Sequence, residues 1–208
     1  MNFNLAQFTT SAATLDACPR DSLTEVAFAG RSNAGKSSAI NAITGHSRLA
    51  RISKTPGRTQ LMNFFSLKAG AYLVDLPGYG YAKVPLAVKD KWQRELERYL
   101  RQREALAGLV LLSDIRHPLK EFDRMMIDWA VQSDLPLHIL LTKADKLKRG
   151  ASQNTLLSVQ TELKDFSGIS VQLFSAMKKT GIDSVRDKLS GWLALPDDGP
   201  EVIESTED

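Results

Sequence analysis

The chain has 208 residues, 43% of them hydrophobic and 25% charged, with a formal net charge of +3. These values are ordinary for a soluble globular protein and allow one α/β domain with a substantial core. The single cysteine, Cys18, excludes an internal disulfide, and no apolar run approaches the ~18 residues of a membrane span. The first residues lack a basic segment before their apolar positions and predict no signal peptide, so we expect a cytoplasmic protein.

The modest net charge hides an uneven distribution along the chain. Residues 196–208 hold six of the 24 acidic residues and no lysine or arginine. Residues 1–195 therefore carry 27 basic and 18 acidic residues, a net charge of +9. A basic body suggests a polyanionic partner, although a merely soluble basic surface explains the charge equally well. We expect the acidic tail, 196–208, to be disordered.

Residues 1–22 are polar with scattered apolar positions and predict only a lead-in to a single domain, which we place at 23–195. Within the domain, apolar runs alternate with segments of helical period. Strands are predicted at 23–29, 61–67, 71–76, 109–113, 137–142 and 169–174. Helices are predicted at 38–44, 119–133, 152–166 and 184–195. This alternation predicts an α/β fold with a mostly parallel six-stranded sheet and helices on both faces.

A phosphate-binding sequence, GRSNAGKS, follows the first strand and fits the P-loop pattern G-x-x-x-x-G-K-[ST]. Its members are Gly30, Arg31, Ser32, Asn33, Ala34, Gly35, Lys36 and Ser37. The two glycines permit a tight turn whose N–H groups converge on a polyphosphate, and the next helix adds the positive end of its dipole. Lys36 can reach the β- and γ-phosphates, and the Ser37 hydroxyl can ligate Mg²⁺.

The segment from His46 to Gln60 has no apolar period and contains four basic residues and a Pro56-Gly57 pair. It predicts a long mobile loop, and loops of this length are usually functional or disordered.

An aspartate ends the third predicted strand in the sequence DLPG, which comprises Asp75, Leu76, Pro77 and Gly78. A carboxylate at the carboxyl end of a strand, in the same fold as a P-loop, can hold Mg²⁺ directly or through water. Gly78 lets its backbone N–H approach a terminal phosphate. Although D-x-x-G is common in turns, its place about 40 residues after a P-loop favours a functional site over a turn.

The fifth predicted strand ends in TKAD, which comprises Thr142, Lys143, Ala144 and Asp145. A carboxylate here can accept hydrogen bonds from the N1–H and N2–H₂ edge of guanine, a donor pair that adenine lacks. Alternatively, Asp145 caps a helix N-terminus. The sixth strand leads into Phe174, Ser175 and Ala176, where backbone N–H groups could lie beside the guanine carbonyl.

The order GRSNAGKS, KTPGRT, DLPG, TKAD, FSA resembles the translation-factor-related P-loop GTPases. In detail the chain, from about Glu25 to Leu195, is similar to the EngB (YihA/YsxC) family of bacterial ribosome-biogenesis GTP-binding proteins. The stretches KTPGRTQLMNFF, VDLPGYGYA, SDIRHPL and TKADKL carry this resemblance.

The resemblance implies a Ras-like fold that binds GTP and GDP at the strand carboxyl ends. It implies that switch I comprises Gly57, Arg58, Thr59, Gln60 and Leu61 and that DLPG opens switch II. Mg²⁺ would be held by Ser37, Thr59 and Asp75, and hydrolysis would depend on Lys36, Thr59 and Gly78. The implied partner is the large ribosomal subunit or its precursor, including its rRNA, with an effect on cell division and septation through that role. We expect a monomer.

Two departures from the general GTPase pattern affect the expected chemistry. Thr142 stands where most GTPases have Asn, which leaves Asp145 as the main discriminator of the base. Tyr79 follows Gly78 where Ras-like proteins carry a water-positioning Gln, so slow intrinsic hydrolysis is expected. Asn33 in the P-loop could help to hold K⁺ against the phosphates, or it could simply stabilise the loop by hydrogen bonds to the backbone.

A basic helix face is predicted after switch II. At 100° per residue, Trp92, Leu96, Tyr99, Leu100 and Leu106 fall on one face. The opposite face carries Lys91, Arg94, Arg98 and Arg101. This face is either a contact for RNA or the ribosome or an ordinary solvated surface.

Three alternatives remain open from the sequence. A P-loop ATPase or small-molecule kinase would need an acceptor pocket or lid, and none is evident. A nucleotide-gated RNA-binding scaffold would bind nucleotide without hydrolysing it. A membrane surface or a cell-division protein could also be the partner of the basic face. His46, His117 and His138 have no clustered partners and predict no metal site, and the Asp114–Pro118 segment is either close to the site or a structural turn.

Overall fold

The computed structural model describes residues 1–50, 61–68, 70–79 and 86–195, and for residues 86–92 it describes the backbone alone. The predicted loop from His46 to Gln60 therefore lies outside the described residues from 51 onward. The predicted acidic tail, 196–208, lies wholly outside them. Among those described, no helix is both long and apolar enough to cross a membrane.

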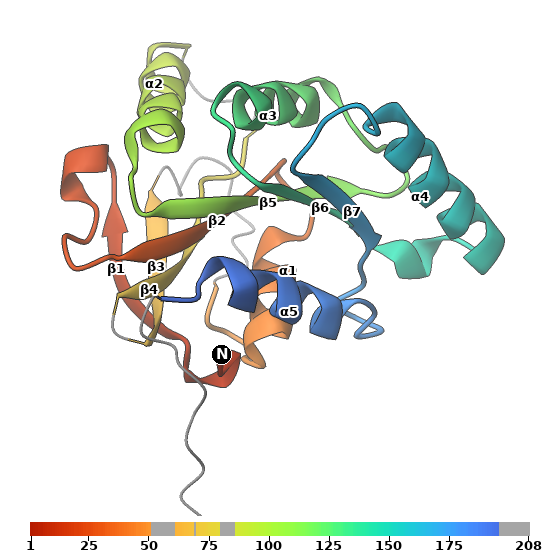
Figure 1. The fold of residues 1–208 in the computed structure, drawn as a ribbon, viewed down its shortest axis with the longest axis horizontal. Coiled ribbons are helices and arrows are strands. Elements are labelled where there is room, and N and C mark those ends of the chain that lie inside the picture. Colours follow the sequence, from red (N-terminus) through yellow and green to blue (C-terminus); the bar gives the residue numbers. More distant parts are fainter. Residues whose placement is uncertain (51–60, 69, 80–85, 196–208) are drawn as a thin grey trace, which may run out of the picture.

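A seven-stranded sheet forms the centre of the described molecule (Figure 1). Its strands are β1 (Gln7–Ala12), β2 (Thr24–Gly30), β3 (Met62–Lys68), β4 (Ala71–Asp75), β5 (Leu106–Asp114), β6 (Leu137–Thr142) and β7 (Ile169–Leu173). Their order across the sheet is β1-β3-β4-β2-β5-β6-β7. The pairs β1–β3 and β3–β4 are antiparallel, and the other four pairs are parallel. Every residue of β2, β4 and β6 is buried, which explains their continuous apolar character.

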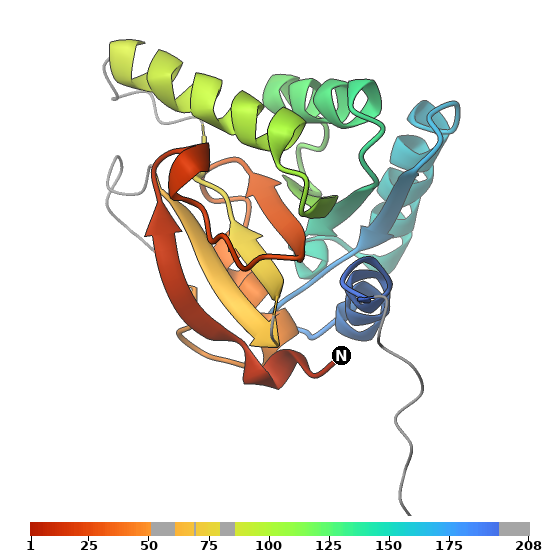
Figure 2. The ribbon, with the colours of Figure 1, turned by 60° about the vertical axis from the view of Figure 1, so that its left-hand side comes forward.

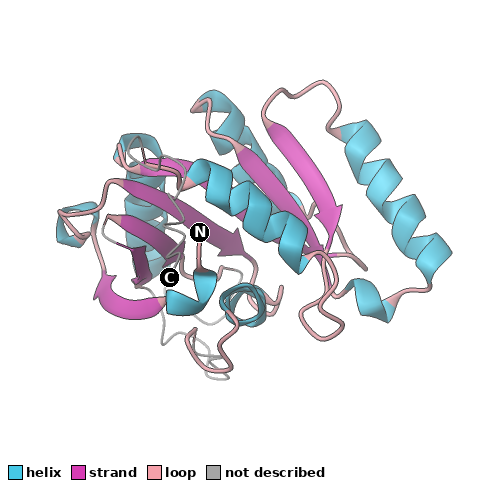
Figure 3. Cartoon of the chain, turned by 60° about the horizontal axis from the view of Figure 1, so that its bottom comes forward, coloured by secondary structure: helices cyan, strands magenta, loops and turns pink. Residues whose placement is uncertain are grey.

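Helices cover both faces of this sheet, as Figures 1 and 2 show. They are α1 (Lys36–Thr44), α2 (Leu86–Gln102), α3 (Glu121–Gln132), α4 (Arg149–Glu162) and α5 (Ile182–Trp192), with short turns η1 (Phe3–Leu5), η2 (Leu15–Ala17) and η3 (Ala144–Lys146). Side chains of α2, α3 and α4 join one hydrophobic cluster, whereas those of α1 and α5 join a second cluster on the other face. Figure 3 shows the strands in magenta between these cyan helices. The predicted α/β class with helices on both faces is confirmed.

The prediction of six strands was wrong by one, because residues 1–22 are more than a lead-in. They contribute β1, which pairs with β3 at the edge of the sheet. Only Phe8 and Ala12 of this strand are apolar, and Phe8 is 56% exposed while its ring packs edge-to-face on Phe65. An edge strand with one thinly covered face leaves almost no apolar alternation to detect.

The predicted apolar face of the helix after switch II needs one correction. Leu96, Tyr99 and Leu100 are buried on α2, as expected, but Leu106 is the first residue of β5. The helix ends at Gln102, and Leu106 enters the same hydrophobic cluster from the strand. The side chain of Trp92 lies outside the described residues.

A buried carboxylate fastens the end of α2 to the start of β2. Glu25 is fully buried and accepts a hydrogen bond from the Tyr99 hydroxyl at 2.6 Å and one from Arg103 Nε at 2.9 Å. Arg103 also donates to the carbonyl of Pro19 at 2.7 Å. Removing one partner of such a buried ionic group is costly, because the remaining charge is left uncompensated.

The close approach of β5 to α5 generates a prediction for stability. A Cβ atom added at Gly108 would lie 2.5 Å from the Trp192 ring, so the indole would have to move. We expect Gly108→Ala to lower the free energy of unfolding by about 1–3 kcal/mol through overpacking. Denaturant titration measures this change. Gly150→Ala, at a helical position with nothing within 4 Å of the added atom, is the matched control and should not destabilise the protein. Equal stability of the two variants would contradict this packing.

Candidate nucleotide-binding site

The predicted site residues gather at one edge of the sheet. The P-loop follows β2, Asp75 ends β4, Thr142 ends β6, and Phe174 follows β7. These four strands are parallel, so their carboxyl ends meet at the same edge, where open α/β sheets bind their ligands.

The P-loop backbone has the shape of an anion cradle. Asn33 and Gly35 have φ values of 65° and 96°, while Ala34 between them does not, and α1 begins directly afterwards at Lys36. Successive residues that alternate in this way turn their N–H groups toward a common point. A Cβ at Gly30 would lie 3.0 Å from the carbonyl oxygen of Leu112, so the loop passes close to β5. The geometry suits a phosphate at a helix N-terminus.

Lys36 and Asp75 form an ion pair at the centre of the edge. Their side chains are only 11% and 9% exposed, so the charges lie in a sheltered part of the site. Ser37 is the next residue along α1. A hydroxyl and a carboxylate are oxygen ligands of the kind that Mg²⁺ accepts, and the lysine supplies positive charge for phosphate oxygens. The donor set therefore fits a magnesium–polyphosphate ligand.

The DLPG segment packs against the P-loop. The N–H of Leu76 donates to the carbonyl of Phe28 at 3.0 Å, which extends the pairing of β4 with β2. A Cβ at Gly78 would lie 3.7 Å from the Cα atom of Ser32, and the N–H of Ser32 donates to the carbonyl of Tyr79 at 2.8 Å. Gly78 is thus held beside the P-loop. Pro77 is buried with Leu76.

The TKAD segment is also tied to the P-loop, by two side chains. The Thr142 hydroxyl donates to the carbonyl of Ala34 at 2.6 Å. The Lys143 ammonium donates to the carbonyl of Asn33 at 2.6 Å and to Asp114 Oδ2 at 2.9 Å. Thr142 stands where most GTPases have Asn, yet its hydroxyl still joins the TKAD segment (hereafter the base segment) to the P-loop (hereafter the phosphate cradle).

Asp145 lies beside the segment that follows β7. Its Oδ1 accepts a hydrogen bond from the Ser175 hydroxyl at 2.6 Å, and the N–H of Ala144 donates to the carbonyl of Phe174 at 3.1 Å. The Ser175 bond lowers the pKa of Asp145, so the carboxylate is an ionised acceptor at neutral pH. The alternative role as a helix cap is not observed, because Asp145 lies within η3 and the N-cap of α4 is Lys148.

Asp114 lies close to this site. The sequence left open whether it did so or only formed a structural turn. It ends β5 and accepts hydrogen bonds from Lys143 and, at 2.9 and 2.7 Å, from the Arg116 guanidinium. The Arg116 bonds hold the pKa of Asp114 well below its usual range, and Lys143 lowers it further. Its position at the carboxyl end of a strand was the only sequence feature that pointed to the site. Its partner Lys143 could not be identified from the sequence because it lies 29 residues away along the chain.

Several predicted residues are not brought into this arrangement. Gly57, Arg58, Thr59 and Gln60 lie outside the described residues, and Leu61, just before β3, is 38% exposed. His138 is buried and bonded to Ser170 and Gln172. Within the described ranges, no cluster of His, Cys, Asp and Glu has the grouping that holds a metal ion.

The basic face of α2 is partly neutralised. Arg98 forms a two-point ion pair with Asp16 of η2 at 3.1 Å, and Arg101 pairs with Glu97 at 3.2 Å. Arg94 is exposed and makes no ion pair with any described side chain. The side chain of Lys91 lies outside the described part of the chain.

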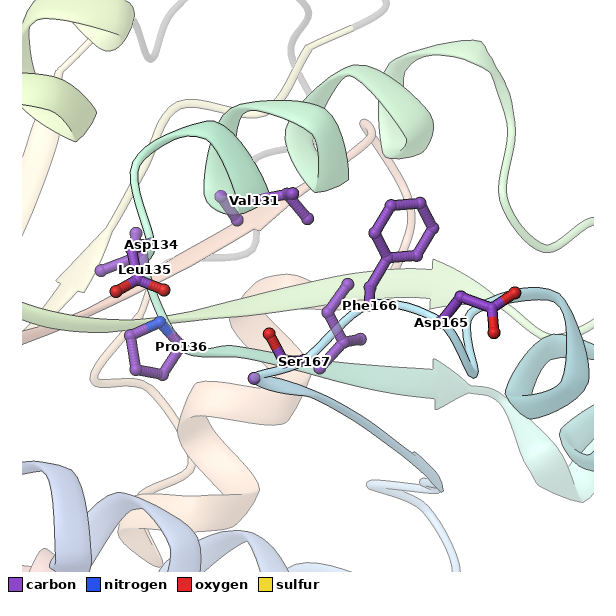
Figure 4. Close-up of a pocket in the computed structure, with 10 residues that line it drawn as sticks. Val131, Asp134, Leu135, Pro136, Asp165, Phe166 and Ser167 are labelled. Atoms are coloured by element: carbon purple, nitrogen blue, oxygen red, sulfur yellow. The ribbon is translucent and has the colours of Figure 1, made fainter.

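A pocket of about 180 Å³ lies at the opposite end of the sheet, where β6 and β7 begin (Figure 4). Its lining combines apolar residues, among them Val131, Leu135 and Phe166, with polar ones, among them Asp134 and Asp165. This position separates it from the phosphate and base segments.

Comparisons with known proteins agree with the geometry. Residues 25–143 match the family described as 50S ribosome-binding GTPase. A crystal structure of a probable GTP-binding protein EngB is 21% identical, with 82% of this chain and 98% of that chain covered and a TM-score of 0.65. A GDP-bound FeoB fragment from S. thermophilus is 28% identical, with 81% and 61% covered and a TM-score of 0.55.

A more distant structure shares the same fold. Elongation factor SelB from Methanococcus maripaludis, in complex with a GTP analogue, is 16% identical, with 85% of this chain and 35% of that chain covered and a TM-score of 0.59. The family match covers more than half of the chain and includes the P-loop, DLPG and the first residues of TKAD. The chain therefore belongs to the 50S ribosome-binding GTPase family, and its domain is a P-loop GTPase domain that binds guanine nucleotide.

Proposed function

We propose that this protein is a Mg²⁺-dependent GTPase switch that acts in assembly of the large ribosomal subunit. The observation that carries the proposal is the physical joining of the base segment to the phosphate cradle through Thr142 and Lys143. This joining supports a site in which a guanine acceptor and a triphosphate cradle share one edge of the sheet. Binding of GTP would order the neighbouring switch segments, and hydrolysis would release them.

The site residues have distinct proposed roles. Lys36 and the P-loop N–H groups hold the β- and γ-phosphates, and Ser37, Asp75 and Thr59 hold Mg²⁺ when it is bound. Gly78 donates its N–H to the terminal phosphate. Hydrolysis is an in-line attack of water on the γ-phosphate, which the protein promotes mainly by positioning and charge stabilisation. Tyr79 supplies no amide for that water, which supports a slow intrinsic rate.

The proposed partner is the large ribosomal subunit or its precursor, including its rRNA. A net charge of +9 over residues 1–195 is compatible with a polyanion, and the family description names the 50S ribosome. We place the action of the protein in the cytoplasm, as a monomer, with cell division affected through ribosome supply.

A non-hydrolysing RNA-binding scaffold is the second candidate function. It would keep the same nucleotide site and basic surface, because both can serve in gated binding without turnover. A single-turnover hydrolysis assay separates it from a GTPase. The ATPase or kinase alternative has no support in the arrangement around Asp145.

The first prediction from this proposal concerns base specificity. Asp145→Asn should weaken GTP binding by about 2–4 kcal/mol, because guanine N1–H loses its charged acceptor. The same variant should gain affinity for xanthosine triphosphate, whose edge suits an amide. Calorimetric titration of the wild type and the variant with GTP and with xanthosine triphosphate measures both changes in affinity. Asp165→Asn, at the pocket on the opposite end of the sheet, is the control and should leave both affinities unchanged.

The second prediction concerns the ribosomal contact. Arg94→Glu combined with Arg101→Glu should abolish co-sedimentation with large subunits in the presence of a non-hydrolysable GTP analogue. Binding of the wild type should fall steeply with salt, since phosphate contacts release counterions. Arg98 is left in place because its ion pair with Asp16 fastens η2 to α2. The control combines Lys164→Glu, just after α4, with Lys188→Glu on α5, which changes the net charge by the same amount away from α2. Loss of binding in both double variants would show that net charge alone governs the contact.

The third prediction concerns K⁺. The Asn33 side chain is exposed, and its main-chain carbonyl accepts a hydrogen bond from Lys143. If K⁺ offsets charge on the phosphates, replacing Na⁺ by K⁺ should raise hydrolysis at least ~10-fold, a barrier change of about 1.4 kcal/mol. Asn33→Ala should remove the difference and retain Mg²⁺-GTP binding. Equal rates in the two salts, at matched ionic strength and without ribosomes, would sink the K⁺ hypothesis.

A further inference from the structure

Tyr79 stands directly after Gly78, and its side chain contacts two residues of α3. The residue is only 5% exposed. Its ring stacks on Phe122 with an interplanar angle of 21°, and its hydroxyl donates to Asp123 Oδ1 at 3.1 Å. The residue that follows the DLPG segment is therefore anchored against α3.

The anchor itself is held from two further elements. Asp123 is 1% exposed, and its Oδ2 accepts a hydrogen bond from the Ser113 hydroxyl at 2.8 Å and one from the N–H of Lys120 at 3.2 Å. Ser113 in turn accepts a hydrogen bond from the N–H of Leu119 at 3.1 Å. Both carboxylate oxygens are thus engaged by β5, by the start of α3 and by Tyr79. Such a fully connected buried network favours one arrangement of its members.

The main chain of Tyr79 carries this rigidity to the phosphate cradle. Its carbonyl accepts the N–H of Ser32 in the P-loop at 2.8 Å. Two residues earlier than Gly78, Leu76 is fixed by its bond to the carbonyl of Phe28. Gly78 therefore lies between two fixed points, and a Cβ added there would lie 3.7 Å from the backbone of Ser32.

We propose that Tyr79 is a positioning residue for the terminal phosphate. The hydrogen bond to Asp123 fixes the Tyr79 side chain, which in turn fixes the main chain next to Gly78. The Gly78 N–H is thereby oriented toward the position of the γ-phosphate before GTP binds. A preorganised donor is effective because it needs no rearrangement when charge appears. The inference rests on the proposed GTP-switch function. It adds to that function a connection from α3 through Tyr79 to the Gly78 N–H.

The same contacts could also serve only to stabilise the core, and a second tyrosine allows the two roles to be separated. Tyr99 is fully buried, and its hydroxyl donates to the buried carboxylate of Glu25. The chemistry matches that of Tyr79 and Asp123. Glu25 lies near the start of β2, at the end of the strand opposite the P-loop, so loss of this bond changes stability without touching the site.

The test compares Tyr79→Phe with Tyr99→Phe in the full chain. Affinities for GDP and for a non-hydrolysable GTP analogue are measured with Mg²⁺, and melting temperatures report on stability. GDP has no γ-phosphate, so its affinity is an internal control for a folded cradle. Tyr79→Phe should weaken the GTP analogue at least ~5-fold relative to GDP, the scale of one lost hydrogen bond. Asp123→Asn should shift the same ratio, whereas Tyr99→Phe should lower only the melting temperature.

An unchanged ratio in both Tyr79→Phe and Asp123→Asn would overturn the inference and leave the GTPase proposal standing. An equal shift in Tyr99→Phe would overturn it too, because the ratio would then follow stability. Failure of the wild type to bind either nucleotide would overturn the proposed function and this inference together.

Discussion

The N–H groups of the P-loop can converge on a phosphate because two of its carbonyl groups are hydrogen-bonded to side chains of the TKAD segment. The carbonyl of Ala34 accepts from Thr142, and the carbonyl of Asn33 accepts from Lys143. These two bonds fix the left-handed turns around Asn33 and Gly35 that no regular element would maintain. The rest of the site depends on this constraint, since a loop free to turn its peptides would lose the convergent donors.

The fold supplies these donors through its strand order. Because β2 lies between β4 and β5, with β6 next, the ends of four strands surround one loop. Three of these strands contribute a side chain. Asp75 of β4 pairs with Lys36, and Asp114 of β5 pairs with Lys143. Thr142 of β6 donates to the loop carbonyl of Ala34. A parallel sheet is therefore the means by which residues more than 100 positions apart act together. The TKAD segment and the P-loop are thus one hydrogen-bonded structure.

The sequence predicted the parts of this arrangement that depend on local order. The P-loop, DLPG and TKAD each follow a buried apolar strand, and buried parallel strands are visible as apolar runs. Strand β1 escaped detection because an edge strand with a single well-buried residue, Ala12, lacks that signal. Leu106 was assigned to a helix because its spacing continued the apolar face of α2 across the turn that ends it.

The remaining features depend on tertiary contacts that no local pattern encodes. The sequence identified Tyr79 as a departure from the usual glutamine, but its partner Asp123 lies 44 residues further on. The tie between Thr142 and Ala34 spans 108 residues and shows how the TKAD segment is joined to the cradle without the usual Asn. The ion pair of Arg98 with Asp16 likewise changes how the basic face of α2 is understood, because one of its cations already has a structural partner.

The central claim is that this edge of the sheet is one site for guanine and polyphosphate together. Displacement of a fluorescent GDP from the 208-residue chain, with Mg²⁺ present, tests it most directly. Unlabelled GDP and GTP should both displace the probe, while ATP at a ~1,000-fold higher concentration should not, because adenine leaves the Asp145 carboxylate without its donors. Displacement by ATP at concentrations similar to those of GTP would contradict the claim.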